Sequence, residues 1–180
     1  CWSLTKESDA MWRIYSPDKK GVKVKATIRK LFIPLFQVGG QRQKMNGVVY
    51  NPSSFVGKVK YADTKTLITM LKNEQLMSGK IFDQSGWGQA STFFFKRVAF
   101  RHEKEVRLIY NSQNDNQFDT FKFDINPIEV FDEIVFDPRM KENIYQEQKD
   151  KVIEWGFDKS IIQSGLYKLK TFTIALRPTY

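Results

Sequence analysis

Cysteine and histidine are almost missing from this chain of 180 residues, which contains one of each, Cys1 and His102. A single cysteine excludes an internal disulfide and a cysteine-rich zinc site. A single histidine argues against a histidine-based metal centre and against a Cys/His nucleophile pair. Any chemistry in this chain is therefore expected to use carboxylates, hydroxyls and arginines.

Long apolar runs are missing as well. No stretch has the length needed to cross a bilayer, and the amino terminus lacks the basic and then apolar pattern of a signal region. Together with the low cysteine content, these absences favour a cytoplasmic protein with no membrane association. The chain starts without methionine, in what looks like the middle of a strand, so we expect it to be the carboxyl-terminal part of a longer polypeptide.

The chain does contain enough apolar side chain for one core. Hydrophobic residues make up 41% and aromatic residues 14%, with fifteen Phe, and the length suits a single domain over residues 1–180. Lys and Arg total 29 against 20 Asp and Glu, a net charge of +9. This surplus favours anionic partners such as nucleic acid, nucleotide phosphates or an acidic protein. The same surplus of positive charge is also typical of a domain whose charge serves only to keep it soluble.

Alternating apolar and polar residues predict strands, and helical spacing predicts a few helices. Strands are expected at 1–4, 22–28, 56–61, 101–110, 118–125, 133–137, 160–164 and 171–176, and helices at 10–15, 64–77 and 141–155. Without a regular βαβ rhythm, this order predicts an α+β fold, mainly an antiparallel split β-sheet or sandwich with short flanking helices. Segments 101–110 and 118–125 are expected to pair across a hairpin loop at 111–117. Irregular connections are expected at 37–46 and 78–90.

The most densely charged segment, 93–110, begins with a run of phenylalanines. If it is extended from Arg101 onward, every second side chain lies on one face. The charged residues on that face are Arg101, Glu103, Glu105 and Arg107. Such a row is either a solvated ladder of ion pairs, which contributes little stability, or the charged wall of an active cleft.

Several separated motifs occur in a characteristic order. They are Cys1-Trp2-Ser3, Met11-Trp12-x-x-Tyr15, Gly21-Val22, Val59-Lys60-Tyr61, Lys96 and Phe100-x-x-Glu103-x-Glu105-Val106-Arg107-Leu108, then Pro127, Phe131 and Ile134. This order resembles a bacterial family catalogued as domain of unknown function 2971, whose members typically show C-F-S, M-W-x-x-Y with a glycine, and later E-x-E-W-R. Val106 stands where that family often has tryptophan. The resemblance covers nearly all of the chain.

A strand that ends in serine, a short aromatic helix and a later E-x-E before an aliphatic strand also look like the ADP-ribosyltransferase fold. In that fold NAD lies in the cleft of a split β-sandwich, and an Arg or His that holds it would lie before Cys1. The resemblance implies that Glu105 stabilises the positive charge that develops on the ribose as nicotinamide leaves. It implies that Glu103 orients or deprotonates the acceptor.

The same resemblance implies residues that bind NAD. They are Ser3, Trp12, Tyr15, Lys96, Arg101 and Arg107. The serine and the two aromatic residues would shape the nicotinamide pocket, and the three cations would hold the pyrophosphate or keep both carboxylates ionised. Each also has a structural interpretation, because aromatic residues on a short helix usually belong to the core and a serine after a strand often caps a turn.

Three functions remain open at this point. The leading hypothesis is an ADP-ribosyltransferase-like enzyme that cleaves NAD and modifies nucleic acid or a protein, as a bacterial toxin or phage-defence effector. The alternative is a non-catalytic basic module, whose salt-dependent binding to nucleic acid or a partner survives loss of both glutamates. The third is a metal-dependent nuclease built from Glu103, Glu105 and Lys104, with Asp137 as the best further acid, although Lys104 alternates to the wrong face.

Overall fold

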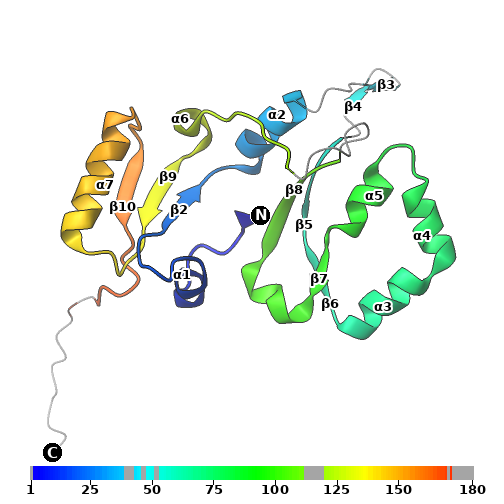
Figure 1. Cartoon of the computed structure of the whole chain (residues 1–180), viewed down its shortest axis with the longest axis horizontal. Helices are drawn as coiled ribbons and strands as arrows, with labels where there is room; N and C mark the ends of the chain where they lie inside the picture. Colours follow the sequence, from blue (N-terminus) through cyan, green and yellow to red (C-terminus); the bar gives the residue numbers. More distant parts are fainter. Residues whose placement is uncertain are drawn as a thin grey trace, which may run out of the picture. The chain divides into compact units, whose positions relative to one another are not determined.

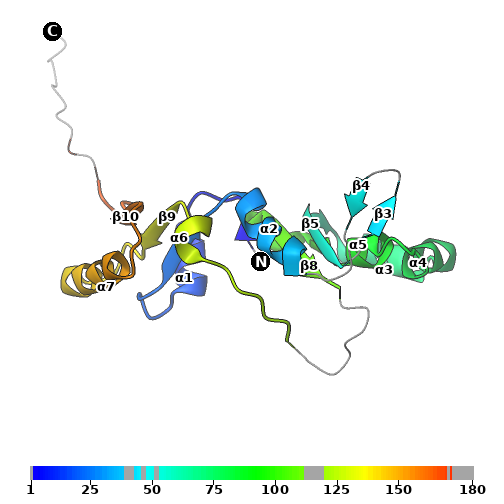
Figure 2. The same ribbon diagram turned by 90° about the horizontal axis from the view of Figure 1, so that it is seen from above.

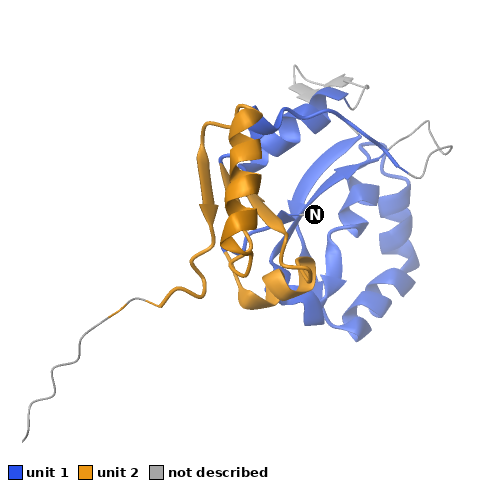
Figure 3. Cartoon of the chain, turned by 60° about the vertical axis from the view of Figure 1, so that its left-hand side comes forward, with its two compact units in different colours: residues 1–6, 25–132 blue, residues 7–24, 133–180 orange. Residues whose placement is uncertain are grey.

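A computed structural model describes residues 2–38, 43–45, 48–50, 53–111, 120–169 and 171. Cys1, most of the predicted hairpin loop at 111–117, most of the predicted strand at 171–176 and part of the predicted loop at 37–46 lie outside the described residues. The chain divides into two compact units (Figure 3): unit 1 is Cys1–Lys6 with Lys25–Asp132, and unit 2 is Glu7–Val24 with Glu133–Tyr180. The single domain stays a prediction.

Short helices and small sheets are combined in an α+β fold, as predicted. The described strands form two sheets of three strands and two sheets of two, with both antiparallel and parallel pairs. Among the described residues, every helix is too short or too polar to cross a membrane.

Unit 1 is built around a three-stranded antiparallel sheet. Its strands, in spatial order, are β1 (Trp2–Ser3), β8 (Glu105–Tyr110) and β5 (Ser54–Lys58). Ser3 lies opposite Glu105 in this register, and Gly57 lies opposite Arg107. A Cβ at Gly57 would lie 2.8 Å from the ring of Phe94, so glycine is what allows this buried ring to pack against β5.

The central position of β8 shows that one predicted pairing is wrong. The strands that pair with β8 are β5, along residues 106–110, and the two-residue β1, at Glu105 and Val106. Residues 120–125 are described and contain no strand. Instead, the ring of Phe121 stacks on Tyr110, with 3.6 Å between the ring centroids.

The other elements of unit 1 surround this sheet (Figures 1 and 2). They are α2 (Ile28–Val38), β3 (Gln43–Met45), β4 (Val48–Tyr50), β6 (Lys60–Ala62), α3 (Thr64–Lys72), α4 (Glu74–Ile81), α5 (Trp87–Thr92), β7 (Phe95–Arg97), the 3-10 helix η1 (Val98–Glu103) and α6 (Pro127–Val130). Strand β6 pairs with β7 in parallel, and β3 with β4 antiparallel. Helix α2 packs on β5, and α4 packs on both α3 and α5.

The helix predicted at 64–77 is two helices. Asn73 ends α3 with its N–H bonded to the carbonyl of Met70, and it begins α4 by accepting a 2.9 Å hydrogen bond from the N–H of Leu76. Asparagine favours such caps because its short side chain competes with the helical backbone bonds. The connection predicted at 78–90 is correspondingly shorter, since α4 extends to Ile81 and α5 begins at Trp87.

Unit 2 combines a mixed sheet with two helices. Its elements are α1 (Asp9–Tyr15), β2 (Val22–Lys25, whose last residue belongs to unit 1), β9 (Glu133–Phe136), α7 (Glu142–Glu154) and β10 (Ser160–Gln163). Strands β9 and β10 are parallel neighbours joined through α7, which lies beside β10 (Figure 1). Both strands and the helix appear where the sequence predicts them. Gly156 follows α7 with φ 88°, a backbone conformation suited to glycine.

A buried ion pair holds α1 in unit 2. Asp137 follows β9 and is completely buried. The guanidinium of Arg139 binds it through Nε–Oδ1 at 3.0 Å and Nη2–Oδ2 at 2.6 Å. The same Nη2 donates to the carbonyls of Trp12 and Ser16 at the end of α1. Burial by itself would raise the pKa of Asp137, but hydrogen bonds from Arg139 and Ser16 outweigh it and hold that pKa below its ordinary value.

Substituting Asp137→Asn should therefore lower the free energy of unfolding at neutral pH by about 3 kcal/mol, because it breaks a buried ion pair. The pKa of Asp137 is lowered on folding, so its contribution is complete above the ordinary carboxyl pKa and is lost as the pH falls through the folded-state pKa. Urea unfolding at neutral and acidic pH should show the difference from wild type shrinking in acid.

The matched control is Asp150→Asn on α7, which removes an exposed carboxylate. It should leave the unfolding curve nearly unchanged. Equal losses for the two variants would contradict a structural role for the Asp137–Arg139 pair.

Candidate functional site

Glu105, the first residue of β8, carries a buried carboxylate. Arg107 lies two residues further along the strand, so its side chain emerges on the same face. Its guanidinium binds the carboxylate with two parallel hydrogen bonds, Nε–Oε1 at 2.8 Å and Nη2–Oε2 at 3.1 Å. Arg107 also donates through Nη1 to the carbonyl of Phe93, which anchors the guanidinium in one orientation.

Lys96 on β7 joins the two glutamates. Its ammonium lies 3.1 Å from Oε2 of Glu105 and 2.5 Å from Oε2 of Glu103, and 4.8 Å from the ring centroid of Phe100. Side chains from β7, η1 and β8 therefore form one network, which we call the charge cluster. Its members are Lys96, Glu103, Glu105 and Arg107.

Strands β1 and β6 hold the backbone of the charge cluster. Ser3 is the strand partner of Glu105, and its hydroxyl donates to the carbonyl of Glu103. The N–H of Glu105 donates to the hydroxyl of Tyr61 at 2.8 Å. Tyr61 belongs to the motif Val59-Lys60-Tyr61. Nothing in the sequence indicated its hydrogen bond to Glu105, because this bond joins strands that are far apart in the chain.

The cluster forms by a different route from the predicted row of charges. The strand begins at Glu105, not at Arg101, because residues 98–103 form η1 and Lys104 adopts a left-handed conformation with φ 44°. A positive φ is uncommon in residues other than glycine, so the lysine at this position did not predict the turn. Arg101 consequently lies on η1, exposed, and its side chain has no hydrogen bond or ion pair within the described part of the chain.

The charges in the cluster stabilise one another. The bidentate hydrogen bonds from Arg107 hold the pKa of Glu105 below its ordinary value, with Lys96 assisting, although burial opposes this. Burial would lower the pKa of Lys96, but hydrogen bonds to Glu103 and Glu105 outweigh it and raise that pKa. Glu105 is therefore an anion and Lys96 a cation at neutral pH.

The remaining predicted site residues, Trp12 and Tyr15, lie on α1 in unit 2. Trp12 is buried, and its indole N–H donates to the carboxylate of Glu7 at 2.8 Å. Tyr15 is exposed. Of the eight predicted site residues, six therefore lie in unit 1 and these two lie in unit 2.

Two of the residues proposed for a metal-dependent nuclease, Asp137 and Lys104, are not members of the charge cluster. Asp137 is buried against Arg139 in unit 2, and Lys104 forms the left-handed turn before β8. Among the residues that the structure describes, no group of three or more His, Cys, Asp or Glu could hold a metal ion.

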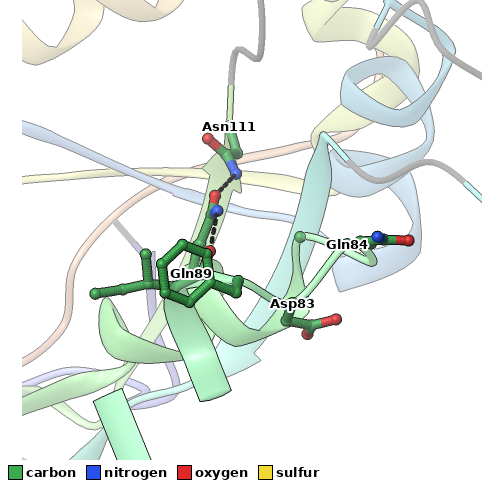
Figure 4. Close-up of a pocket in the computed structure, with 7 residues that line it drawn as sticks. Asp83, Gln84, Gln89 and Asn111 are labelled. Atoms are coloured by element: carbon green, nitrogen blue, oxygen red, sulfur yellow. Dashed lines mark hydrogen bonds between the residues drawn. The ribbon is translucent and has the colours of Figure 1, made fainter. Parts of the chain in front are cut away.

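Sequence reasoning missed a second feature of unit 1. A groove of about 520 Å³ is lined by Ile81, Phe82, Asp83, Gln84, Gly86, Gln89 and Asn111 (Figure 4). None of the predicted site residues lines it. Its residues belong mostly to the segment expected to be an irregular connection, where no periodic signal marks a cavity.

Substituting Glu105→Gln should lower the free energy of unfolding by about 3 kcal/mol at neutral pH, because it leaves two cations facing a neutral amide in a buried site. The pKa of Glu105 is lowered on folding, so the loss should diminish as the pH falls through the folded-state value. Denaturant titrations at several pH values measure this. Glu74→Gln, at an exposed position on α4, is the control; a pH-independent loss at Glu105 would contradict the assignment.

No curated protein and no solved structure matches the chain. A model of the family described as "Protein of unknown function (DUF2971)" matches residues 11–108, which is more than half of the chain. The match extends from α1 through the charge cluster to β8. The resemblance to the ADP-ribosyltransferase fold stays a prediction. On the family match, the chain belongs to the DUF2971 family of proteins of unknown function.

Proposed function

We propose that this protein is an ADP-ribosyltransferase-like enzyme that cleaves NAD, with the charge cluster at its reaction centre. The observation that carries the proposal is the pairing of β1 with β8, in which Ser3 lies directly opposite Glu105. The fold resemblance places both residues at the nicotinamide end of NAD, Ser3 at the nicotinamide pocket and Glu105 at the ribose. They are far apart in the sequence, so their adjacency as strand partners supports a shared pocket.

Glu105 would stabilise the developing charge. When the bond between ribose C1′ and the nicotinamide nitrogen breaks, both electrons go to the nicotinamide ring and the ribose becomes positive. The low pKa of Glu105 keeps its carboxylate negative at neutral pH. Because Arg107 already holds that carboxylate in place, little reorganisation is needed to stabilise the cation.

Glu103 would accept the proton of the attacking group. The acceptor forms the new bond to C1′ with its own lone pair and then loses a proton, which requires a base within hydrogen-bond reach. The Glu103 side chain is 12% exposed against 5% for Glu105. Lys96 binds Oε2 of Glu103, and Oε1 has no hydrogen bond to other described residues, so this oxygen is free to take the proton.

Arg101 would bind the pyrophosphate of NAD. Lys96 and Arg107 are already bound to the carboxylates, and together they hold the pKa of Glu105 below its ordinary value. Arg101 is exposed and its guanidinium is uncommitted among the described side chains, so its planar fork can donate hydrogen bonds to two phosphate oxygens.

The net charge of +9 supports nucleic acid or a nucleic-acid-associated protein as the acceptor. Exposed cations lie on the strands next to the cluster, including Lys60 on β6 and Arg97 on β7. Modification of such an acceptor is the chemistry of a toxin or phage-defence effector, which is the cellular role that we propose.

A second candidate is a non-catalytic module that binds nucleic acid or an acidic protein through its cations. The observation that favours it is the enclosure of Glu105, whose two oxygens both accept hydrogen bonds as in a structural ion pair. This candidate predicts steeply salt-dependent binding that survives Glu103→Gln.

The test incubates the full chain with NAD labelled in the nicotinamide, alone and with RNA, DNA or cell lysate, and measures free nicotinamide. Glu103→Gln should lower transfer to an acceptor by about 10²-fold, the effect of losing a general base. Arg101→Ala should raise KM for NAD with a smaller change in kcat, because it removes a contact made to the bound phosphates.

Lys65→Ala on α3 is the matched control, since it removes an exposed cation outside the cluster. Nicotinamide release by the Glu105→Gln variant is measured only under conditions in which the variant is folded. Nicotinamide release that is absent under every condition, or unchanged in both glutamate variants, would overturn the enzymatic proposal. Salt-dependent nucleic-acid binding without release would establish the second candidate.

A further inference from the structure

The groove beside α4 and α5 has rigid walls. Asp83 accepts hydrogen bonds from the N–H and hydroxyl of Ser85 and from the N–H of Gly88, which close the turn between the two helices. Gly86 in this turn has φ 73°. A Cβ at Gly88 would lie 2.4 Å from the carbonyl of Lys80, so the backbones are in close contact. A cavity with such walls exists before a ligand arrives.

Phe82 provides an aromatic surface at this groove. It ends α4 and is 79% exposed, and its ring contacts no other aromatic ring in the described ranges. A single exposed aromatic residue needs no explanation by itself. A ring that lines a preformed groove next to amide groups is, however, the arrangement on which unpaired nucleobases stack.

Asn111 provides a fixed amide. Its Nδ2 donates to Oε1 of Gln89 at 3.0 Å, and Nε2 of Gln89 donates to the carbonyl of Ile81 at 2.8 Å. Figure 4 shows Gln89 and Asn111 pointing toward one another, with Gln84 and Asp83 directed away from that pair. The N–H of Asn111 is bound to the carbonyl of Ser53, so backbone and side chain are both held.

The hydrogen bonds of Asn111 leave part of its amide available. An amide has two N–H donors and a carbonyl acceptor. One donor is used by Gln89, and the other donor and the carbonyl oxygen have no partner among the residues that the structure describes. The remaining donor and the carbonyl oxygen are complementary to a ring nitrogen and the amino group of adenine, the base that asparagine amides bind.

From these contacts we propose that the groove binds an unpaired adenine of a single-stranded nucleic acid, stacked on Phe82 and hydrogen-bonded by Asn111. A strand fits better than a free nucleotide, because among the described residues Asp83 lines the groove and no Lys or Arg does. The phosphate of a free nucleotide would find no positive charge among these described lining residues. A strand can instead place its phosphates along the basic surface of a protein with a net charge of +9. The site is separate from the charge cluster and does not depend on NAD cleavage.

Fluorescence anisotropy of the full chain with labelled oligoadenylate and oligouridylate RNA, and with oligodeoxyadenylate, tests the proposal. Wild type should bind both adenine strands more tightly than oligouridylate. Phe82→Ala should weaken binding of every strand about tenfold, the effect of losing one base–aromatic stack. Asn111→Ala should instead reduce the preference for adenine about tenfold, because only the base edge is read by this amide.

Trp155→Ala is the control, because Trp155 is an aromatic residue of similar exposure, 74%, in unit 2. It should bind every strand like wild type. Binding unchanged in Phe82→Ala, an equal loss in Trp155→Ala, or an adenine preference that survives Asn111→Ala would overturn the proposal. Displacement of the strand by AMP at equal base concentration would overturn the choice of a strand over a free nucleotide.

Discussion

The buried carboxylate of Glu105 is the constraint on which unit 1 depends. It occupies the first position of the central strand, where an unpaired charge would be strongly destabilising. Arg107 from the same strand and Lys96 from β7 neutralise it, and Lys96 in turn binds Glu103 at the end of η1. One carboxylate thereby ties together three consecutive elements. Truncating either cation would leave a buried charge without its full set of partners, so these residues act as a unit.

The same cluster separates groups that hold the site from groups that are free to react. Lys96 and Arg107 are committed to Glu105, and they keep it ionised and oriented. Arg101 and one oxygen of Glu103 retain unused hydrogen-bonding capacity among the described residues. In the proposed reaction the committed groups provide a fixed field and the uncommitted ones contact NAD and the acceptor. Preorganised charge of this kind stabilises a transition state because it need not reorient during the reaction.

Local signals in the sequence account for most elements and for part of the site. Apolar spacing located α1 and α7, and β-branched and aliphatic residues located β8, β9 and β10. The E-x-E-V-R segment pointed to the charged residues that meet in unit 1. The sequence did not reveal η1 or the break at Asn73, because both depend on single residues whose backbone conformation has no periodic signature. It also missed the groove, whose lining residues come from the end of α4, the turn that follows it, α5 and the residue after β8.

The sequence alone determined the fold class, the family and the residue types available for chemistry, because composition, periodicity and motif order are properties of the chain. Only the tertiary structure decided which residues meet. Ser3 lies opposite Glu105, and β5 rather than residues 120–125 pairs with β8, because strand pairing depends on how the whole unit packs and not on local sequence alone. The tertiary structure also decides whether a charged side chain is exposed to solvent or buried. Glu105 lies in the interior because two strands flank it and two cations compensate its charge.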